Sequence, residues 1–188
     1  MVNQLKVILL ALAVATGTAQ AQTFASINSM FATGLDGTSD MSGYQFVVGH
    51  RVNKNVTVDA NTETLWTDTT KVLVNRLEGG ATFSLPTANT IITPYVRTAL
   101  GSKTVGGNQF AYYSAEPGVR MAVGPGTARL GWRYRSAVDD AQFNDTTRTW
   151  RLLYLLPMNK TLDLNVGVEA SRGDINYNGL LAGFTVRF

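Results

Sequence analysis

Arginines and carboxylates that recur at alternate positions are the residues of this chain with the clearest chemical potential. Read with a period of two, they share one strand face with glycines and small polar residues. The arginines are Arg51, Arg76, Arg97, Arg120, Arg129, Arg133, Arg135, Arg151 and Arg187. The carboxylates are Asp59, Glu63, Glu78, Glu116, Asp163 and Glu169, and no lysine joins them. Because a guanidinium fork binds two carboxylate oxygens, the pattern predicts an ion-paired face with surplus arginine for water or an anion.

Catalytic chemistry has few candidates in this sequence. The chain has one histidine, His50, and no cysteine. The missing cysteines exclude a disulfide scaffold and a cysteine-ligated metal site. His50 shares the apolar face of its segment, where an interfacial imidazole is expected rather than a general base. Ser136 has no histidine within reach to activate it, so no catalytic residue is predicted.

An acidic group in one polar connection is a weak candidate for a metal site. It consists of Asp139, Asp140 and Asp145. Clustered carboxylates suit Ca²⁺ or Mg²⁺, held alone or as a bridge to anionic lipopolysaccharide. The alternative is a solvated, soluble rim. No other cofactor is expected.

Composition limits the chain to one folded domain and a few function classes. The sequence has 188 residues, 45% hydrophobic and 15% charged, which is enough apolar content for one folded unit. The 16 basic residues nearly balance the 13 acidic ones, so net charge gives no support to nucleic-acid binding.

The first 21 residues have the pattern of a secretory signal peptide. Lys6 precedes an unbroken apolar run from Val7 to Val14, and Ala19-Gln20-Ala21 has the small residues that a signal peptidase requires. The apolar run is shorter than the roughly 20 residues of a spanning helix. We therefore predict a cleaved segment over 1–21 and a mature domain over 22–188.

The mature chain divides into ten alternating segments of the length that a tilted membrane strand requires. They are expected near 22–33, 42–52, 56–66, 71–85, 90–102, 110–123, 127–138, 146–156, 161–172 and 178–188. Tight turns are expected at 53–55, 86–89, 124–126 and 157–160, and longer loops at 35–41, 67–70, 103–109, 139–145 and 173–177. Strict alternation of short turns and longer loops is typical of bacterial outer-membrane barrels.

The fold class follows from this pattern together with the aromatic residues. We expect an all-β, closed, antiparallel up-and-down barrel of ten strands, with eight as the fallback. Aromatic residues on the apolar face, such as Trp150 near the loops and Tyr154 near the turns, predict two interfacial girdles. The rival is an exported soluble β-sandwich, because alternation alone fits both folds.

The last segment carries the most specific resemblance. Leu180, Ala182, Phe184, Val186 and Phe188 alternate with other residues, and the chain stops on Phe188. This segment resembles the C-terminal signal of outer-membrane β-barrel proteins, in which Phe184, Val186 and Phe188 would be recognised by the barrel-assembly machinery. The stretches 93–96 and 131–135 also resemble small OmpA-like or porin-like barrels.

The resemblance implies a location, partners and a function class. It implies a bacterial outer-membrane protein with extracellular loops and both termini in the periplasm, in contact with lipid and lipopolysaccharide. The chain is similar to omptin proteases in strand number, and 134–137 superficially resembles the catalytic strand of lipid A deacylase-like barrels, but the histidine of both sites is missing. We therefore expect a structural or surface-interaction barrel, with a narrow anion-preferring pore and an enzyme as the alternatives. The oligomeric state is left open.

Overall fold

The chain folds into ten antiparallel strands. The computed structural model describes residues 22–35, 39–67, 74–87, 91–105, 107–139, 145–173 and 175–188. The strands are β1 (Gln22–Gly34), β2 (Met41–Arg51), β3 (Val56–Thr67), β4 (Val74–Ser84), β5 (Ile92–Val105), β6 (Asn108–Val123), β7 (Gly126–Ala137), β8 (Thr146–Pro157), β9 (Leu162–Gly173) and β10 (Tyr177–Arg187). No helix in these ranges is long and apolar enough to cross a membrane. The predicted signal segment, 1–21, lies outside the described residues.

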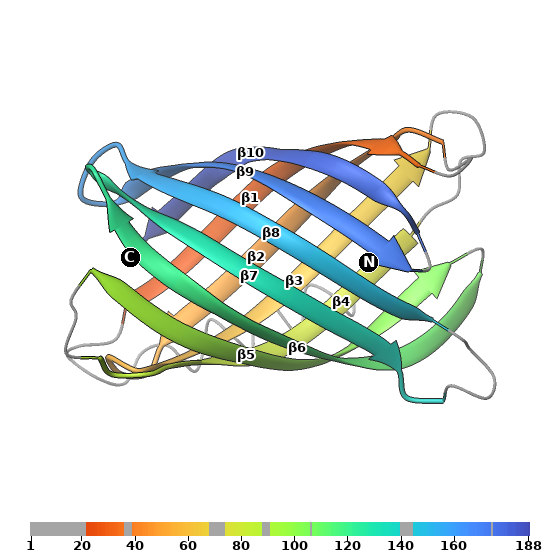
Figure 1. The fold of residues 1–188 in the computed structure, drawn as a ribbon, viewed down its shortest axis with the longest axis horizontal. Helices are drawn as coiled ribbons and strands as arrows, with labels where there is room; N and C mark the ends of the chain where they lie inside the picture. Colours follow the sequence, from red (N-terminus) through yellow and green to blue (C-terminus); the bar gives the residue numbers. More distant parts are fainter. Residues whose placement is uncertain are drawn as a thin grey trace.

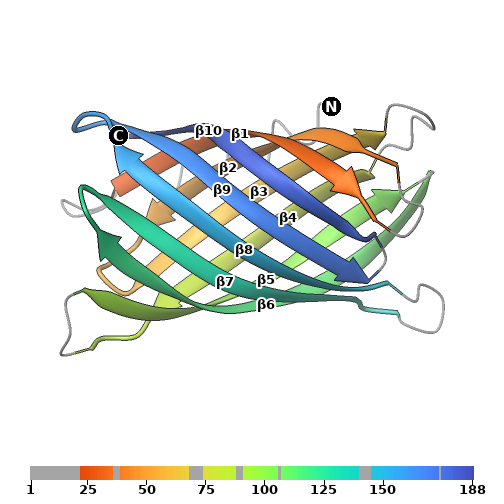
Figure 2. The same cartoon turned by 45° about the horizontal axis from the view of Figure 1, so that its top comes forward.

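The ten strands close into one up-and-down barrel. Each strand pairs with its neighbours in sequence, and β1 pairs with β10 to complete the circle. The closing seam runs from Phe24 opposite Arg187 to Gly34 opposite Tyr177. Figure 1 shows the strands inclined to the long axis, and Figure 2 shows β1 and β10 side by side. The predicted fold class is confirmed, with ten strands rather than the fallback of eight.

Polarity in this barrel is reversed relative to a soluble protein. On β9, Val166 faces outward and is 50% exposed. Glu169 lies on the opposite, inward face of the same strand and is 3% exposed. Leu180 on β10 is 60% exposed, while Asn165 inside the barrel is 1% exposed. An outward apolar band around a buried polar interior is the arrangement of a membrane barrel. It excludes the soluble sandwich, whose core would hold the apolar face.

Asparagine side chains build two of the connections at the end that carries the C-terminus, here called the turn end (Figure 1). The Asn53 carboxamide oxygen accepts hydrogen bonds from the backbone N–H groups of Asn55 and Val56. Asn159 does the same for Thr161 and Leu162. These bonds replace ladder partners lost where the chain reverses, which is why asparagine favours such turns.

The opposite end, here called the loop end, differs from the predicted pattern. Strands β5 and β6 are separated only by 106–107, because the ladder continues through Lys103 opposite Phe110 and Thr104 opposite Gln109. The predicted loop over 103–109 is therefore wrong, as is the strict alternation of lengths, since 85–91 separate β4 from β5 at the turn end. Polar residues at 103–109 are typical of a loop, but here they alternate between the two faces of a continued hairpin.

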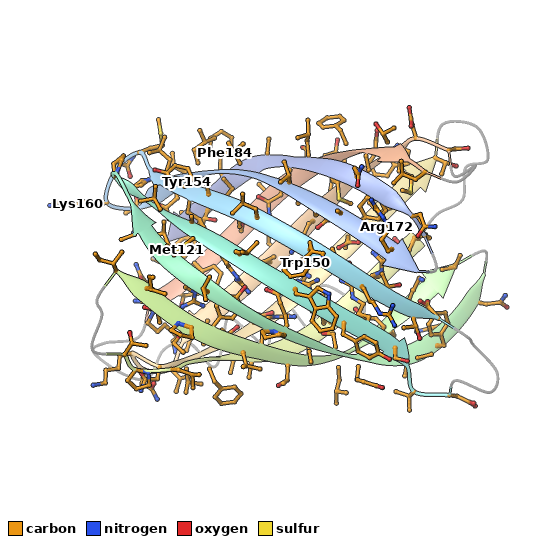
Figure 3. All side chains as sticks on the ribbon, in the orientation of Figure 1. Met121, Trp150, Tyr154, Lys160, Arg172 and Phe184 are labelled. Atoms are coloured by element: carbon orange, nitrogen blue, oxygen red, sulfur yellow. The ribbon has the colours of Figure 1, made fainter. Side chains whose placement is uncertain are left out.

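Aromatic side chains occupy the outer surface toward both ends. Figure 3 shows Tyr154 and Phe184 toward the turn end and Trp150 nearer the loop end. Trp132 lies 6.5 Å from Trp150 between ring centroids, and the Tyr44 and Trp66 rings are 5.4 Å apart. Such rings favour the headgroup level of a bilayer.

Candidate functional site

The centre of the barrel interior is an ion network organised around Glu78 on β4. Its carboxylate forms an ion pair with Arg97, and accepts hydrogen bonds from the Tyr112 hydroxyl at 3.1 Å and the Ser114 hydroxyl at 3.3 Å. Arg135 from β7 approaches the same carboxylate at 3.8 Å. Glu78 is 2% exposed, so its charge depends on these partners in place of water.

A second centre forms around Glu116 on β6. Arg129 Nη2 lies 2.8 Å and Arg133 Nη2 lies 2.7 Å from its two oxygens, and the Tyr95 hydroxyl donates to it at 2.8 Å. The Arg129 and Arg120 guanidinium groups lie 4.5 and 5.2 Å from the centroid of the Tyr95 ring. Tyr95 is 1% exposed, so a rigid ring positions both cations.

The other predicted carboxylates each find a predicted arginine. Glu63 pairs with Arg76, and Arg97 binds Asp59 as well as Glu78. Glu169 accepts from Arg151 and from the Tyr177 hydroxyl. At the turn end Asp163 pairs with Arg187, whose side chain is 29% exposed.

The structure thus brings together most of the residues singled out by spacing. Every predicted carboxylate has an arginine partner, and seven of the nine predicted arginines have a carboxylate partner. Arg51 and Arg120 form no ion pair within the described part of the chain. The predicted surplus of arginine is therefore located at two positions, both at the turn end.

The inward glycines make room mainly for rings rather than for guanidinium groups. A Cβ on Gly118 or Gly131 would overlap Tyr95, and one on Gly101 would overlap Tyr112. Gly80 is the position where a Cβ would meet a guanidinium, that of Arg97. Glycine is required at these sites because a large side chain from another strand packs directly against the backbone of the glycine.

An apolar cluster packs on one side of the loop-end half of the lumen, and the sequence analysis missed it. We call it the loop-end cluster. Its members are Met30, Ala32, Met41, Leu65, Val74, Tyr177 and Leu181. The sequence analysis assigned the polar face of each strand to the interior, so it could not identify apolar residues that face inward. The available signal was local failure of alternation, as at Leu180-Leu181 and Leu65-Trp66, where both faces become apolar.

A lysine also faces inward, contrary to the prediction that none does. Lys103 is 2% exposed and forms an ion pair with Asp145, whose other oxygen accepts from Thr147 at 3.3 Å. The pair arises because β5 continues where a loop was expected.

This lysine changes the interpretation of the acidic metal candidate. Asp145 faces the lumen and its charge is matched by Lys103. Asp139 follows the end of β7, and Asp140 lies outside the described residues. Among the described residues no group of three or more His, Cys, Asp or Glu could hold a metal.

The turn-end half of the lumen contains a cavity of about 390 Å³, here called the turn-end cavity. Its lining reaches from Gln22, Arg51 and Arg187 at the strand ends to Arg97 and Asn165 near the middle of the barrel. Seven arginines and two carboxylates, Asp59 and Asp163, line it. The interior is therefore asymmetric, because the loop-end half contains an apolar cluster beside ion pairs such as Lys103–Asp145, whereas the turn-end half contains a positively charged cavity.

The two residues considered for catalysis lie on different strands at opposite ends of the barrel. His50, near the turn end of β2, has its Nδ1 atom 3.1 Å from the Thr23 hydroxyl. Ser136, near the loop end of β7, is 1% exposed, and its hydroxyl lies 3.5 Å from that of Thr146. The structure does not assemble them into one site.

Comparison with known proteins adds support at the level of the fold. No protein-family model matches the sequence, and no curated protein is significantly similar to it. An outer-membrane channel from Pseudomonas putida F1 superposes with a TM-score of 0.56 at 7% identity, covering 93% of this chain and 98% of that one. Neisserial surface protein A gives a TM-score of 0.45 at 12% identity, covering 91% of this chain and 97% of that one. The KdgM porin in complex with disordered oligogalacturonate gives a TM-score of 0.46 at 8% identity, covering 89% of this chain and 99% of that one.

The class of protein follows from the fold, the reversed polarity and the similarity to the Pseudomonas channel. The chain has the closed antiparallel barrel of outer-membrane β-barrel proteins. The predicted resemblance to small outer-membrane barrels is confirmed at the level of the fold.

Proposed function

We propose that this protein is an integral barrel of the bacterial outer membrane whose lumen is closed, and that it serves a structural or surface-interaction role. The observation that carries this proposal is the loop-end cluster. Its side chains occupy the lumen where a pore would have to continue, and Leu65 and Met30 are 1% and 2% exposed. The lining of the turn-end cavity includes Arg97 and Arg133 of the central ion network.

The orientation and maturation of the protein are part of the proposal. Residues 1–21 act as a cleaved signal, the loop end faces the outside and both termini lie in the periplasm. Phe184 on the outer face of β10 and Phe188 directly after this strand are 49% and 76% exposed, and both are available to the barrel-assembly machinery before the seam with β1 closes. The outward aliphatic band contacts lipid, and the loop end contacts lipopolysaccharide.

Conductance in planar bilayers tests the closed lumen. Folded protein, identified by migration in detergent gels that changes on boiling, is inserted beside a general porin as the positive control. We expect membranes with inserted protein to show no conductance steps, because neither the loop-end cluster nor the ion network offers a water-filled path. Stable, voltage-independent steps from the wild-type protein would contradict the proposal.

A narrow anion-preferring pore is the second candidate, and the seven arginines of the turn-end cavity favour it. This function requires the loop-end cluster to move aside. It predicts conductance with a reversal potential that reports anion preference in a salt gradient, so the same recording distinguishes the two candidates.

A further inference from the structure

The turn-end cavity contains more positive charge than its own carboxylates neutralise. Five of its seven arginines are held by carboxylates, either within the lining or directly behind it. Arg51 and Arg120 have no ion pair within the described chain. Arg120 donates one hydrogen bond to the Ser84 hydroxyl, at 3.2 Å, and Arg51 is exposed where β2 ends. Two guanidinium groups are therefore available to an anion.

These arginines are positioned by a rigid support. Tyr95 is buried beneath the guanidinium groups of Arg120 and Arg129, and its hydroxyl is fixed by Glu116. Arg51 reaches the cavity from β2, across the lumen from β6, and both Arg51 and Arg129 repel Arg120 electrostatically. Like charges held together in this way are stabilised when an anion binds between them.

One arginine of the cavity lining also has a buried donor atom without a partner. Arg133 is 5% exposed and lines the cavity, and its Nε and Nη2 atoms bind Glu116. Its Nη1 atom is buried and has no hydrogen-bond partner within the described part of the chain. A buried N–H group left unpaired costs free energy, which an anionic ligand oxygen would recover once the Arg133 side chain turns this atom toward the cavity.

We propose that the turn-end cavity is a binding site for a phosphate group, carried either by a small soluble phosphate ester or by a phospholipid headgroup of the inner leaflet. A phosphate has the charge and the oxygen atoms to accept from Arg51, Arg120 and Arg133 together, in the bidentate geometry that arginine favours. The cavity volume of about 390 Å³ suits a small organic molecule. Phe24, Val47 and Leu153 in the lining would contact its carbon skeleton. This site does not require the lumen to be closed.

Titration with inorganic phosphate tests the proposal on folded, delipidated protein in detergent. Isothermal calorimetry and thermal unfolding are measured in phosphate and in chloride at equal ionic strength. We expect phosphate to bind and stabilise the wild type, and the double variant Arg51→Gln/Arg120→Gln to bind at least about tenfold more weakly, since charged hydrogen bonds are lost. Arg148→Gln, an exposed arginine near the loop end, is the control with the same kind of charge change and should bind like the wild type.

A second measurement distinguishes the two sources of the phosphate. Native mass spectrometry of protein extracted in mild detergent is compared for the wild type and the double variant. Retention of phosphatidylglycerol by the wild type alone identifies a lipid headgroup, whereas phosphate binding without lipid retention identifies a soluble ester. If the double variant does not fold, Arg51→Gln is used instead, since Arg51 is exposed at the strand end. Equal binding by the wild type and the variant, or an equal response to chloride, would overturn the proposal.

Discussion

The two halves of the lumen differ in the side chains that occupy their inward positions. Around the loop end the inward positions of β1, β2, β3, β4 and β10 carry apolar side chains, which form the loop-end cluster. Around the turn end the inward positions of β2, β6, β7 and β8 carry arginines, which leave the turn-end cavity. Strand alternation is the same in both halves. Closure therefore depends on which side chains face inward, not on strand number alone.

The ion network between the two halves couples them. Glu78 binds Arg97 on the adjacent strand β5 and Arg135 on β7, so it joins strands that are not neighbours in the barrel. Glu116 binds two arginines of the adjacent strand β7. Such a network repays the cost of removing charges from water only when nearly every member is paired. Substitutions in the buried centre should therefore lower the free energy of unfolding more than substitutions at the solvated turn end.

Glu78→Gln has the largest expected effect. The substitution leaves Arg97 and Arg135 with less compensating charge in a fully buried site, and we expect the free energy of unfolding to fall by about 3 to 5 kcal/mol. Urea unfolding in lipid vesicles measures it. Asp163→Asn is the matched control at the turn end, where Arg187 reaches solvent and the expected loss is about 1 kcal/mol. Similar losses for both variants would show that the two ends do not differ in solvation.

Leu65→Ala tests the packing of the loop-end cluster. Leu65 is 1% exposed among apolar neighbours, so the truncation should destabilise the barrel by about 2 to 4 kcal/mol. Val47→Ala removes an inward apolar side chain beside the turn-end cavity, where less contact is lost, and should cost under about 1 kcal/mol. Equilibrium unfolding measures both. A smaller loss at Leu65 than at Val47 would mean that the loop-end cluster is loosely packed.

Gly118→Ala should have an intermediate to small effect. The new methyl would overlap the Tyr95 ring, and we expect a loss of about 1 to 3 kcal/mol from overpacking. Gly79→Ala places its methyl on the outer face with no atom within 4 Å, and should change stability by under about 0.5 kcal/mol. Thermal unfolding in detergent compares them. An unchanged melting temperature for Gly118→Ala would show that Tyr95 is not confined by its neighbouring strand.

Much of this architecture could be predicted from periodicity. Alternation between two faces, as in Leu164 against Asn165, located ten strands to within a few residues and assigned the charged side chains to one face. The pattern works because a strand that is lipid-facing on one side and polar on the other permits only one register.

Long-range features were not available from the pattern. Lys103 and Asp145 are far apart in sequence and meet only because β5 extends beyond its expected end. The loop-end cluster also requires knowledge of which strands face one another across a closed barrel. Spacing gives the face of a residue but not its partner on the other side of the lumen.

Thiol labelling tests most directly the central claim that the lumen is open at the turn end and closed at the loop end. The chain has no cysteine, so single substitutions give unambiguous signals. Thr57→Cys lines the turn-end cavity, and Ala32→Cys lies in the loop-end cluster, where Ala32 is 6% exposed. In folded protein we expect a small charged methanethiosulfonate reagent to modify Thr57→Cys and to leave Ala32→Cys unmodified until urea unfolds the barrel. Equal modification of both variants in the folded barrel would contradict the account.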